Sequence, residues 1–213
     1  MAFEMESNLM NGYRLAYDRA MADLQSKNPA EIERNADVRY DASTRIFHIP
    51  YIGTGHQVNL QDGSVMRLTP DGPVPAGTTV GVLILHYLLH AVKHPLSGRM
   101  ISFREVRGVS GYFPTFSKRA ILPLQGTFAG KEGALTAAGA ALGGVPAPFG
   151  DTAVTLRIFP LVPVTYVLWH GDEEIPSSAA VLFDDSIQFF LPGEDIVLAA
   201  SFGTYALMKH AKK

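Results

Sequence analysis

Residues 38–68 constrain the fold more than any other part of the chain, because apolar and polar residues alternate there with a period of two. Four short alternating runs, residues 38–40, 45–49, 56–60 and 65–68, are separated by segments rich in Asp, Ser, Gly and Thr. Alternation bounded by turn residues predicts strands that pair with their sequence neighbours. We therefore expect an antiparallel meander, ended by a loop rich in Pro and Gly over residues 69–77.

Helical patterns lie on both sides of this meander. Apolar residues recur at spacings of three and four over residues 9–24, where Ser7 is a candidate N-cap. Asn28 and Pro29 predict the start of a second helix, which should end near Ala36. Residues 80–93 predict a third helix that is apolar on nearly every side and hence buried on most sides.

The C-terminal half alternates in the same way. We expect strands at residues 154–159, 164–169 and 179–183, a helix over 131–142, and a last helix from Gly193 to about His210. Residues 99–124 are aromatic and basic and fit no regular pattern. The fold class predicted is α+β, an antiparallel sheet packed with several helices. One domain over residues 1–213 is expected, with two small lobes divided near residues 70–80 as the alternative.

Composition excludes several functional classes. The absence of Cys rules out disulfides and cysteine-ligated iron–sulfur clusters, and 18 Lys+Arg against 20 Asp+Glu gives no basic field for nucleic acid. The N-terminus lacks the pattern of a signal peptide, and the longest apolar stretch is too short to cross a bilayer. We expect a cytoplasmic protein without a membrane or nucleic-acid partner. P-loop, Rossmann, serine-elbow and zincin motifs do not occur in the sequence.

Three histidines, His86, His90 and His94, follow one another at four-residue intervals. On a helix each such step turns about 40°, so the three would share one face. Imidazoles one turn apart can bind a metal, and a single one can be the axial ligand of a haem or corrinoid. The alternative is that His86 and His90 are core residues hydrogen-bonded to a carbonyl or carboxylate, with His94 a cation of the last helical turn.

Acidic residues follow two of the expected strands. Asp172 and Glu173 come directly after one strand, and Asp184 follows the next. If these strands pair, the carboxylates are expected to approach one another and to bind a divalent cation or supply a general base. The alternative is a solvated hairpin loop whose acids accept hydrogen bonds from local backbone N–H groups.

Basic and aromatic residues crowd into one short region. They are Arg99, Arg104, Arg107, Lys118 and Arg119, with Phe103, Tyr112, Phe113 and Phe116. Guanidinium groups suit carboxylates and phosphates, and aromatic rings can stack on a planar ligand. Arg104, Arg107 and Phe103 are therefore candidate cofactor-binding residues, and surface pairing with Glu105 is the alternative.

Short motifs in order along the chain resemble a known family. They are Leu85-His86-Tyr87-Leu88, Ile101-Ser102-Phe103-Arg104-Glu105, Phe159-Pro160-Leu161-Val162-Pro163, Trp169-His170-Gly171-Asp172-Glu173-Glu174-Ile175-Pro176, Leu182-Phe183-Asp184-Asp185-Ser186 and Leu191-Pro192-Gly193-Glu194-Asp195. Together they are similar to domain of unknown function family 3786, over about residues 13–198. The resemblance implies an anaerobic bacterial or archaeal setting, in which metal cofactors and corrinoid-dependent chemistry are plausible. Some relatives carry an additional Cys-rich iron–sulfur segment, which this chain lacks.

The leading hypothesis is a cofactor-binding or accessory protein whose partner is a small molecule: a tetrapyrrole (corrinoid or haem) or a divalent metal. The histidine helix would line the pocket, and the Arg99–Arg107 region would meet acidic groups of the ligand. One alternative is a metal-assisted hydrolase that uses Asp172, Glu173 and Asp184. Another is a non-catalytic interaction module. The sequence leaves the oligomeric state open.

Overall fold

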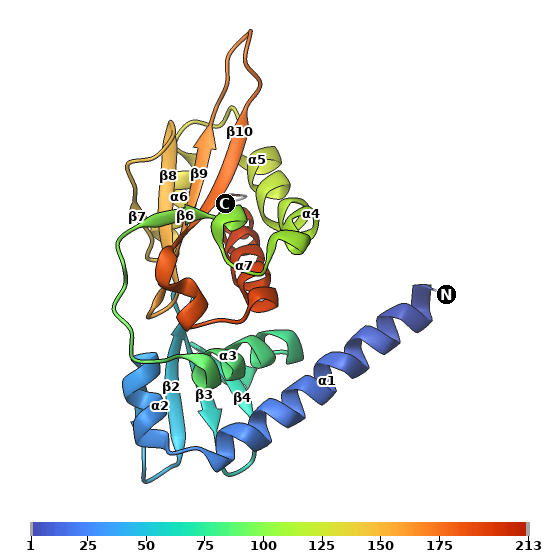
Figure 1. Cartoon of the computed structure of the whole chain (residues 1–213), viewed down its shortest axis with the longest axis vertical. Helices are drawn as coiled ribbons and strands as arrows, with labels where there is room; N and C mark the ends of the chain where they lie inside the picture. Colours follow the sequence, from blue (N-terminus) through green and yellow to red (C-terminus); the bar gives the residue numbers. More distant parts are fainter. Residues whose placement is uncertain (1, 212–213) are drawn as a thin grey trace. The chain divides into compact units, whose positions relative to one another are not determined.

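The computed structural model describes residues 2–211, with side chains from residue 11 onward (Figure 1). The chain divides into two compact units. The first comprises Met1–Pro50 and Thr54–Lys93, and the second comprises Tyr51–Gly53 and His94–Lys213. The main division therefore follows residue 93 instead of falling near residues 70–80. Each unit contains one antiparallel five-stranded sheet with helices, which confirms the α+β class.

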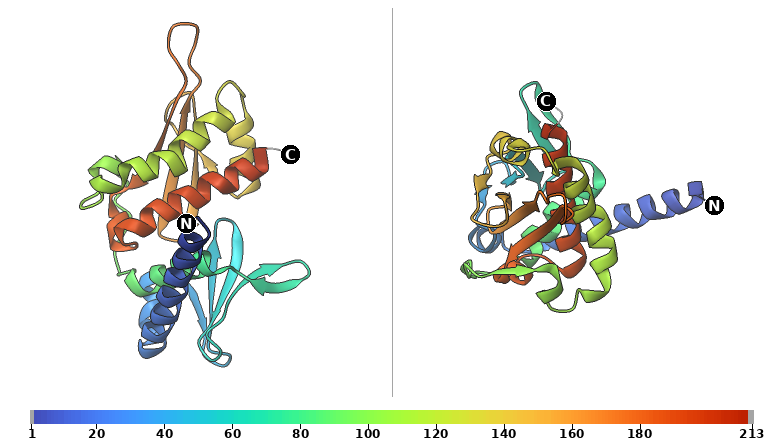
Figure 2. Two further views of the ribbon diagram at one scale, coloured as in Figure 1. Left: turned by 90° about the vertical axis from the view of Figure 1, so that its right-hand side faces the viewer. Right: turned by 90° about the horizontal axis from the view of Figure 1, so that it is seen from above.

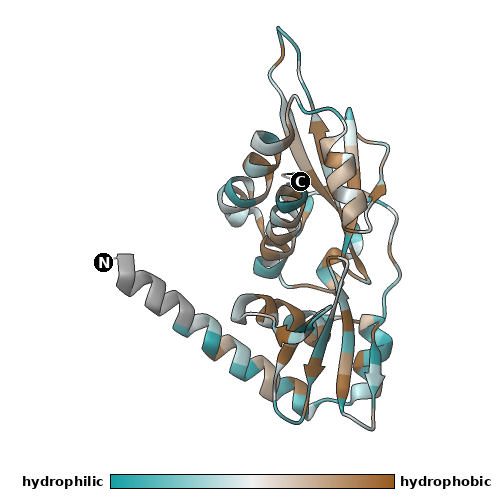
Figure 3. Cartoon of the chain, turned by 180° about the vertical axis from the view of Figure 1, so that it is seen from behind, coloured by the Kyte–Doolittle hydropathy of each residue, from teal (hydrophilic) through white to brown (hydrophobic). Residues whose placement is uncertain are grey.

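The sheet of the first unit is the predicted meander with one additional strand. Its spatial order follows the sequence: β1 (Arg39–Asp41), β2 (Ile46–Tyr51), β3 (Thr54–Asn59), β4 (Val65–Thr69) and β5 (Gly72–Pro75). The fifth strand was expected as loop, because two of its four residues are prolines. Proline donates no ladder hydrogen bond and is tolerated at a sheet edge, which is where β5 lies. Figure 3 shows apolar residues along these strands and polar residues at their turns.

Three helices complete the first unit: α1 (Ala2–Ser26), α2 (Pro29–Ala36) and α3 (Thr78–His90). The first begins before Ser7, so Ser7 lies inside the helix and is not its N-cap. The predicted start of the second is confirmed, because Asn28 is its N-cap and its side chain accepts a hydrogen bond from Ala30 N at 3.0 Å. The third ends at His90, since Ala91 adopts an extended ψ of 127°.

α1 packs along α3, and a glycine permits the close approach (Figure 1). A Cβ atom added at Gly81 would lie 2.6 Å from the ring of Tyr17, closer than side chains ordinarily approach. The Tyr17 hydroxyl in turn donates to the carbonyl of Gly63 at 2.8 Å. This crossing brings the following turns of α3 beside the second half of α1.

A buried tyrosine fixes α3 against α2. Tyr87 is fully buried and its hydroxyl donates to the carbonyl of Ala36, the last residue of α2, at 2.6 Å. Replacement of Tyr87 by Phe is expected to lower the free energy of unfolding by about 1–2 kcal/mol, because a buried carbonyl loses its partner. Hydrogen exchange of the α2 and α3 amides measures the effect. Tyr205→Phe is the control, since Tyr205 is 43% exposed; equal exchange in both variants would refute the prediction.

The second unit contains a sheet in the order β6 (Met100–Ser102), β10 (Ser178–Asp184), β9 (Val162–Trp169), β8 (Thr152–Phe159) and β7 (Val145–Pro146). The three long strands confirm the three predicted in the C-terminal half. α6 (Ala134–Ala141) packs on β8, and α7 (Gly193–Ala211) contacts both β8 and β9. β9 is central and buried along nearly its whole length.

Residues 99–124, which fitted no pattern, form β6 and a succession of short helical segments. These are η1 (Phe103–Glu105), η2 (Ser110–Tyr112), α4 (Phe113–Phe116), the π-helical η3 (Ser117–Ile121) and α5 (Leu122–Phe128). Prolines at the starts of α4 and α5 interrupt the regular helical pattern. In Figure 2 this segment and α7 lie side by side on one face of the sheet. Among the described residues, no helix is both long and apolar enough to cross a bilayer.

Candidate functional site

His86 and His90 lie on successive turns of α3, as the spacing predicts. Most of α3 from Gly81 to Leu88 is buried, whereas His86 is half-buried and His90 is exposed. Their ring centroids are 5.9 Å apart and the ring planes are nearly perpendicular, at 89°. The expectation that this helix is buried on most sides is therefore confirmed, and its C-terminal end is the part where both imidazoles face a groove.

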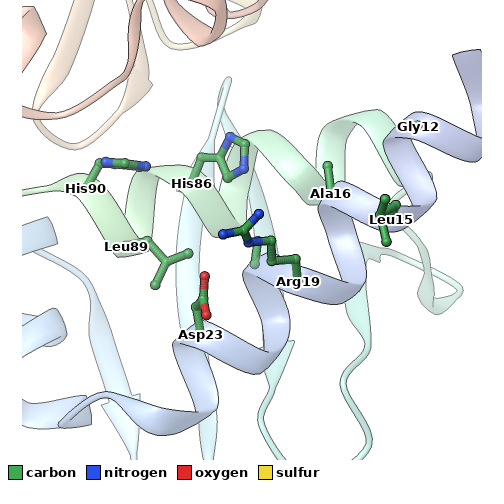
Figure 4. A pocket seen from close by; sticks show the side chains of 9 residues that line it. Gly12, Leu15, Ala16, Arg19, Asp23, His86, Leu89 and His90 are labelled. Atoms are coloured by element: carbon green, nitrogen blue, oxygen red, sulfur yellow. The ribbon is translucent and has the colours of Figure 1, made fainter.

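This groove runs between α1 and α3 and has a volume of about 400 Å³ (Figure 4). Six residues of α1 and three of α3 line it. Apolar side chains form one part of its wall, among them Leu15, Ala16 and Leu89. Leu15 is 71% exposed. Volumes of about 300–1,000 Å³ with largely apolar walls are typical of small-molecule sites.

Four polar side chains supply the rest of the lining: His86, His90, Arg19 and Asp23. Arg19 and Asp23 are four residues apart on α1 and so share a helix face. Figure 4 shows the guanidinium of Arg19 directed across the groove towards the imidazole of His86, with the Asp23 carboxylate one turn further along α1. The groove thus joins an apolar wall to two imidazoles, one permanent cation and one carboxylate.

The structure separates His94 from the other two histidines. α3 ends before His94, which belongs to the second unit and stacks on Phe189 with ring centroids 3.9 Å apart and planes 13° apart. The prediction of three histidines on one helical face is therefore wrong, because the helix stops a turn earlier than Pro95 alone suggested. Among the side chains that the structure describes, residues 11–211, no group of three or more His, Asp or Glu residues is arranged to hold a metal ion.

The acidic residues Asp172 and Asp184 do not share a site. β9 and β10 pair antiparallel, with Trp169 opposite Ser178 and Val164 opposite Phe183. Asp172 therefore lies in the loop that joins the two strands, whereas Asp184 lies at the far end of β10. The shared-site prediction is wrong, since each acid follows its own strand and the C-terminal ends of antiparallel neighbours lie at opposite edges of a sheet.

The Asp172 carboxylate instead accepts hydrogen bonds from the backbone of its own loop. Asp172 accepts hydrogen bonds from the backbone N–H groups of Ile175 and Glu174 at 2.7 and 2.9 Å, and these bonds lower the pKa of its carboxyl. Glu173 is exposed in the same loop. This is the alternative considered for the loop, a hairpin whose acid caps local backbone, and it leaves Asp172 without a site to share.

Phe103 is a core residue of the second unit. Its side chain is 1% exposed and stacks on Phe116, with ring centroids 4.1 Å apart and planes 9° apart. The prediction that Phe103 stacks on a ligand is therefore wrong, because its face is already covered. Arg104 and Arg107 are exposed, and the Arg104 guanidinium lies 3.5 Å from the ring centroid of Phe113. Both arginines belong to the second unit, whereas His86 and His90 belong to the first.

Sequence reasoning missed Arg19 and Asp23. Their four-residue spacing beside Ala16 and Ala20 marks a common helix face. That signal shows which residues lie together on α1 and gives no information on which element α1 packs against.

One family model matches the chain, that of "Domain of unknown function (DUF3786)", over residues 28–205. The matched span contains His86 and His90, and α1 precedes it. No curated protein and no solved structure matches the chain.

Proposed function

The chain belongs to the DUF3786 family, and we propose that it binds a metal-bearing tetrapyrrole, a haem or a corrinoid, in the groove between α1 and α3. The observation that carries this proposal is the pair His86 and His90, which line one groove from successive turns of a single helix. The protein would act as a cofactor-binding or accessory protein.

The chemistry of the lining supports a tetrapyrrole. The metal of such a ligand already has four ring nitrogens, so it needs only one or two axial ligands from the protein, and neutral imidazole is a common one. The apolar wall of Leu15, Ala16 and Leu89 offers contact to the macrocycle. A metal-assisted hydrolase receives no comparable support, because Asp172 and Asp184 lie at opposite ends of their strands.

The experiment is a titration of haemin and of hydroxocobalamin into the whole chain, followed by visible absorbance. Because both imidazoles come from one helix, only one of them can be the axial ligand of a given metal, and we expect either His86→Ala or His90→Ala to lower the affinity for at least one of the two compounds by about tenfold or more. The double variant should not bind. The melting temperatures of the ligand-free variants, measured alongside, show whether either substitution also removes a structural contact, such as the edge-to-face contact of the two imidazoles.

His94→Ala is the matched control, because His94 lies outside the groove and stacks on Phe189. It should retain wild-type affinity. Equal affinity in wild type and in the double variant would refute the proposal. If wild-type protein changes the visible spectrum of neither haemin nor hydroxocobalamin, the proposal is refuted as well. That result would favour a non-catalytic interaction module.

A further inference from the structure

We infer that the ligand carries free carboxylates and that Arg19 binds one of them, an inference that rests on the proposed function of the groove. The alternative ligand is a bare divalent cation held by His86 and His90. Arg19 separates these two classes of ligand, because its guanidinium is the permanent positive charge of the groove lining.

The position of Arg19 disfavours a bare cation. Arg19 lines the same groove as His86, and its guanidinium is directed across the groove towards that imidazole (Figure 4). A dication bound by the imidazole would be repelled by this permanent positive charge. The described residues also provide no third His, Asp or Glu that would complete a ligand set with the two histidines. Two imidazoles alone leave a bare ion short of the four ligands that a structural zinc site uses.

The same position favours a carboxylate. A guanidinium presents two parallel N–H donors that match the two oxygens of a carboxylate, a pairing stronger than a neutral hydrogen bond. Arg19 lies on α1 while the two imidazoles lie on α3, so a ligand that spans the groove would meet both. Arg19 and Asp23 together make the formal charge of the lining zero when the imidazoles are neutral. Two imidazoles, an apolar wall and a guanidinium together fit a ligand with a metal centre, an apolar body and an acidic side group.

The experiment compares haemin with haemin dimethyl ester, in which the two carboxylates are neutral and the metal is the same. We expect wild type to bind haemin about tenfold more tightly than the ester, and Arg19→Gln to lose that preference while its affinity for the ester is unchanged. Arg14→Gln is the control. It removes the same charge from an equally exposed position of the same helix, but Arg14 pairs with Asp18 at 3.2 Å and does not line the groove.

Three results would overturn the inference. If wild type binds haemin and its ester equally and the affinity depends on His86 or His90, the groove binds a tetrapyrrole but Arg19 does not recognise its carboxylates. If Arg19→Gln and Arg14→Gln weaken haemin binding equally, the loss of affinity comes from the lower net positive charge of α1 and not from a specific contact between Arg19 and a ligand carboxylate. If wild type binds neither compound, the inference fails, and the proposed function fails with it only if hydroxocobalamin does not bind either.

Discussion

Replacement of Gly203 by alanine is expected to destabilise the second unit by about 3 kcal/mol, as overpacking of a filled core does at the upper end of its range. Gly203 lies in α7, where a Cβ atom would overlap the hydroxyl of Tyr166 on β9 and lie 2.9 Å from Ile158 on β8. Tyr166 is fully buried, and its hydroxyl donates to the carbonyl of Ala200 at 3.0 Å. The hydroxyl cannot move aside without losing this bond.

Trp169, the single tryptophan of the chain, lies in the second unit and is 40% exposed, so its fluorescence during denaturant unfolding reports on this unit. Gly126→Ala is the control. Gly126 is an exposed helical glycine with open space around the added Cβ, and alanine there should be neutral or slightly stabilising. Equal midpoints for Gly203→Ala and Gly126→Ala would show that α7 can shift away from the sheet at little cost.

A second substitution tests the stated cause. If the overlap with the Tyr166 hydroxyl is the origin of the loss, Tyr166→Phe should cost less in the Gly203→Ala background than in wild type. The two residues are in contact, so their effects should not add. Additive effects would place the strain elsewhere, for example at Ile158.

The sequence predicted those parts of the fold that depend on neighbours along the chain. The meander follows from alternation and turn residues, because antiparallel strands joined by short turns pair with the next strand. The start of α2 follows from Asn28 and Pro29, because the Asn28 side chain caps the first turn and Pro29 is favoured at the first helical position. The break after α6 follows from Gly143 and Gly144, since Gly143 adopts a positive φ of 72°.

The errors share a physical origin in contacts between distant parts of the chain. α3 ends at His90 although the apolar pattern continues, so its pattern alone placed His94 on the helix. Phe103 was predicted to stack on a ligand, but its ring stacks on Phe116, thirteen residues further along the chain. Asp172 and Asp184 were expected at the same edge of the sheet. Antiparallel pairing of β9 with β10 instead places the C-terminal ends of these two strands at opposite edges.

The candidate groove was predictable on one side only. The spacing of His86 and His90 marks the polar face of α3, because residues four apart on a helix are neighbours. Arg19 faces them from a helix more than sixty residues earlier in the sequence. No pattern within either helix shows that the two pack together; the small residue Gly81, against which Tyr17 lies, becomes informative only once that contact is known.

Asp184 connects three segments of the second unit through its carboxylate. It accepts hydrogen bonds from the backbone N–H groups of Ser97 and Gly98 at 2.9 and 2.7 Å, and from the backbone N–H of Ser186 at 3.0 Å. The hydroxyls of Ser97 and Ser186 donate to it as well. The side chain is buried, and it holds the segment before β6 against the end of β10.

These bonds make the stability of the second unit depend on pH. Burial raises the pKa of the Asp184 carboxyl, but the hydrogen bonds from Ser186, Ser97 and Gly98 outweigh burial and lower the pKa from 3.8 to about 2. Because the folded-state pKa lies below the unfolded value, the contribution is fully present above about pH 4 and is lost as the pH falls from about 4 through 2. We expect Trp169 fluorescence to show this loss during denaturant unfolding at a series of pH values.

Asp184→Asn should lower the free energy of unfolding by about 2–3 kcal/mol at neutral pH, because an amide cannot accept all these bonds and buried donors lose their partner. The amide does not titrate, so the variant should also lack the contribution of Asp184 to the pH dependence of stability between pH 4 and 2. The difference in free energy of unfolding between wild type and variant should therefore shrink as the pH falls through this range. The adjacent Asp185→Asn is the matched control. Asp185 is partly exposed and pairs with Arg99 at 2.8 Å on the surface, so its loss should cost under about 1 kcal/mol. A difference between Asp184→Asn and wild type that stays constant from pH 7 to pH 2 would show that the carboxylate charge does not hold these segments together.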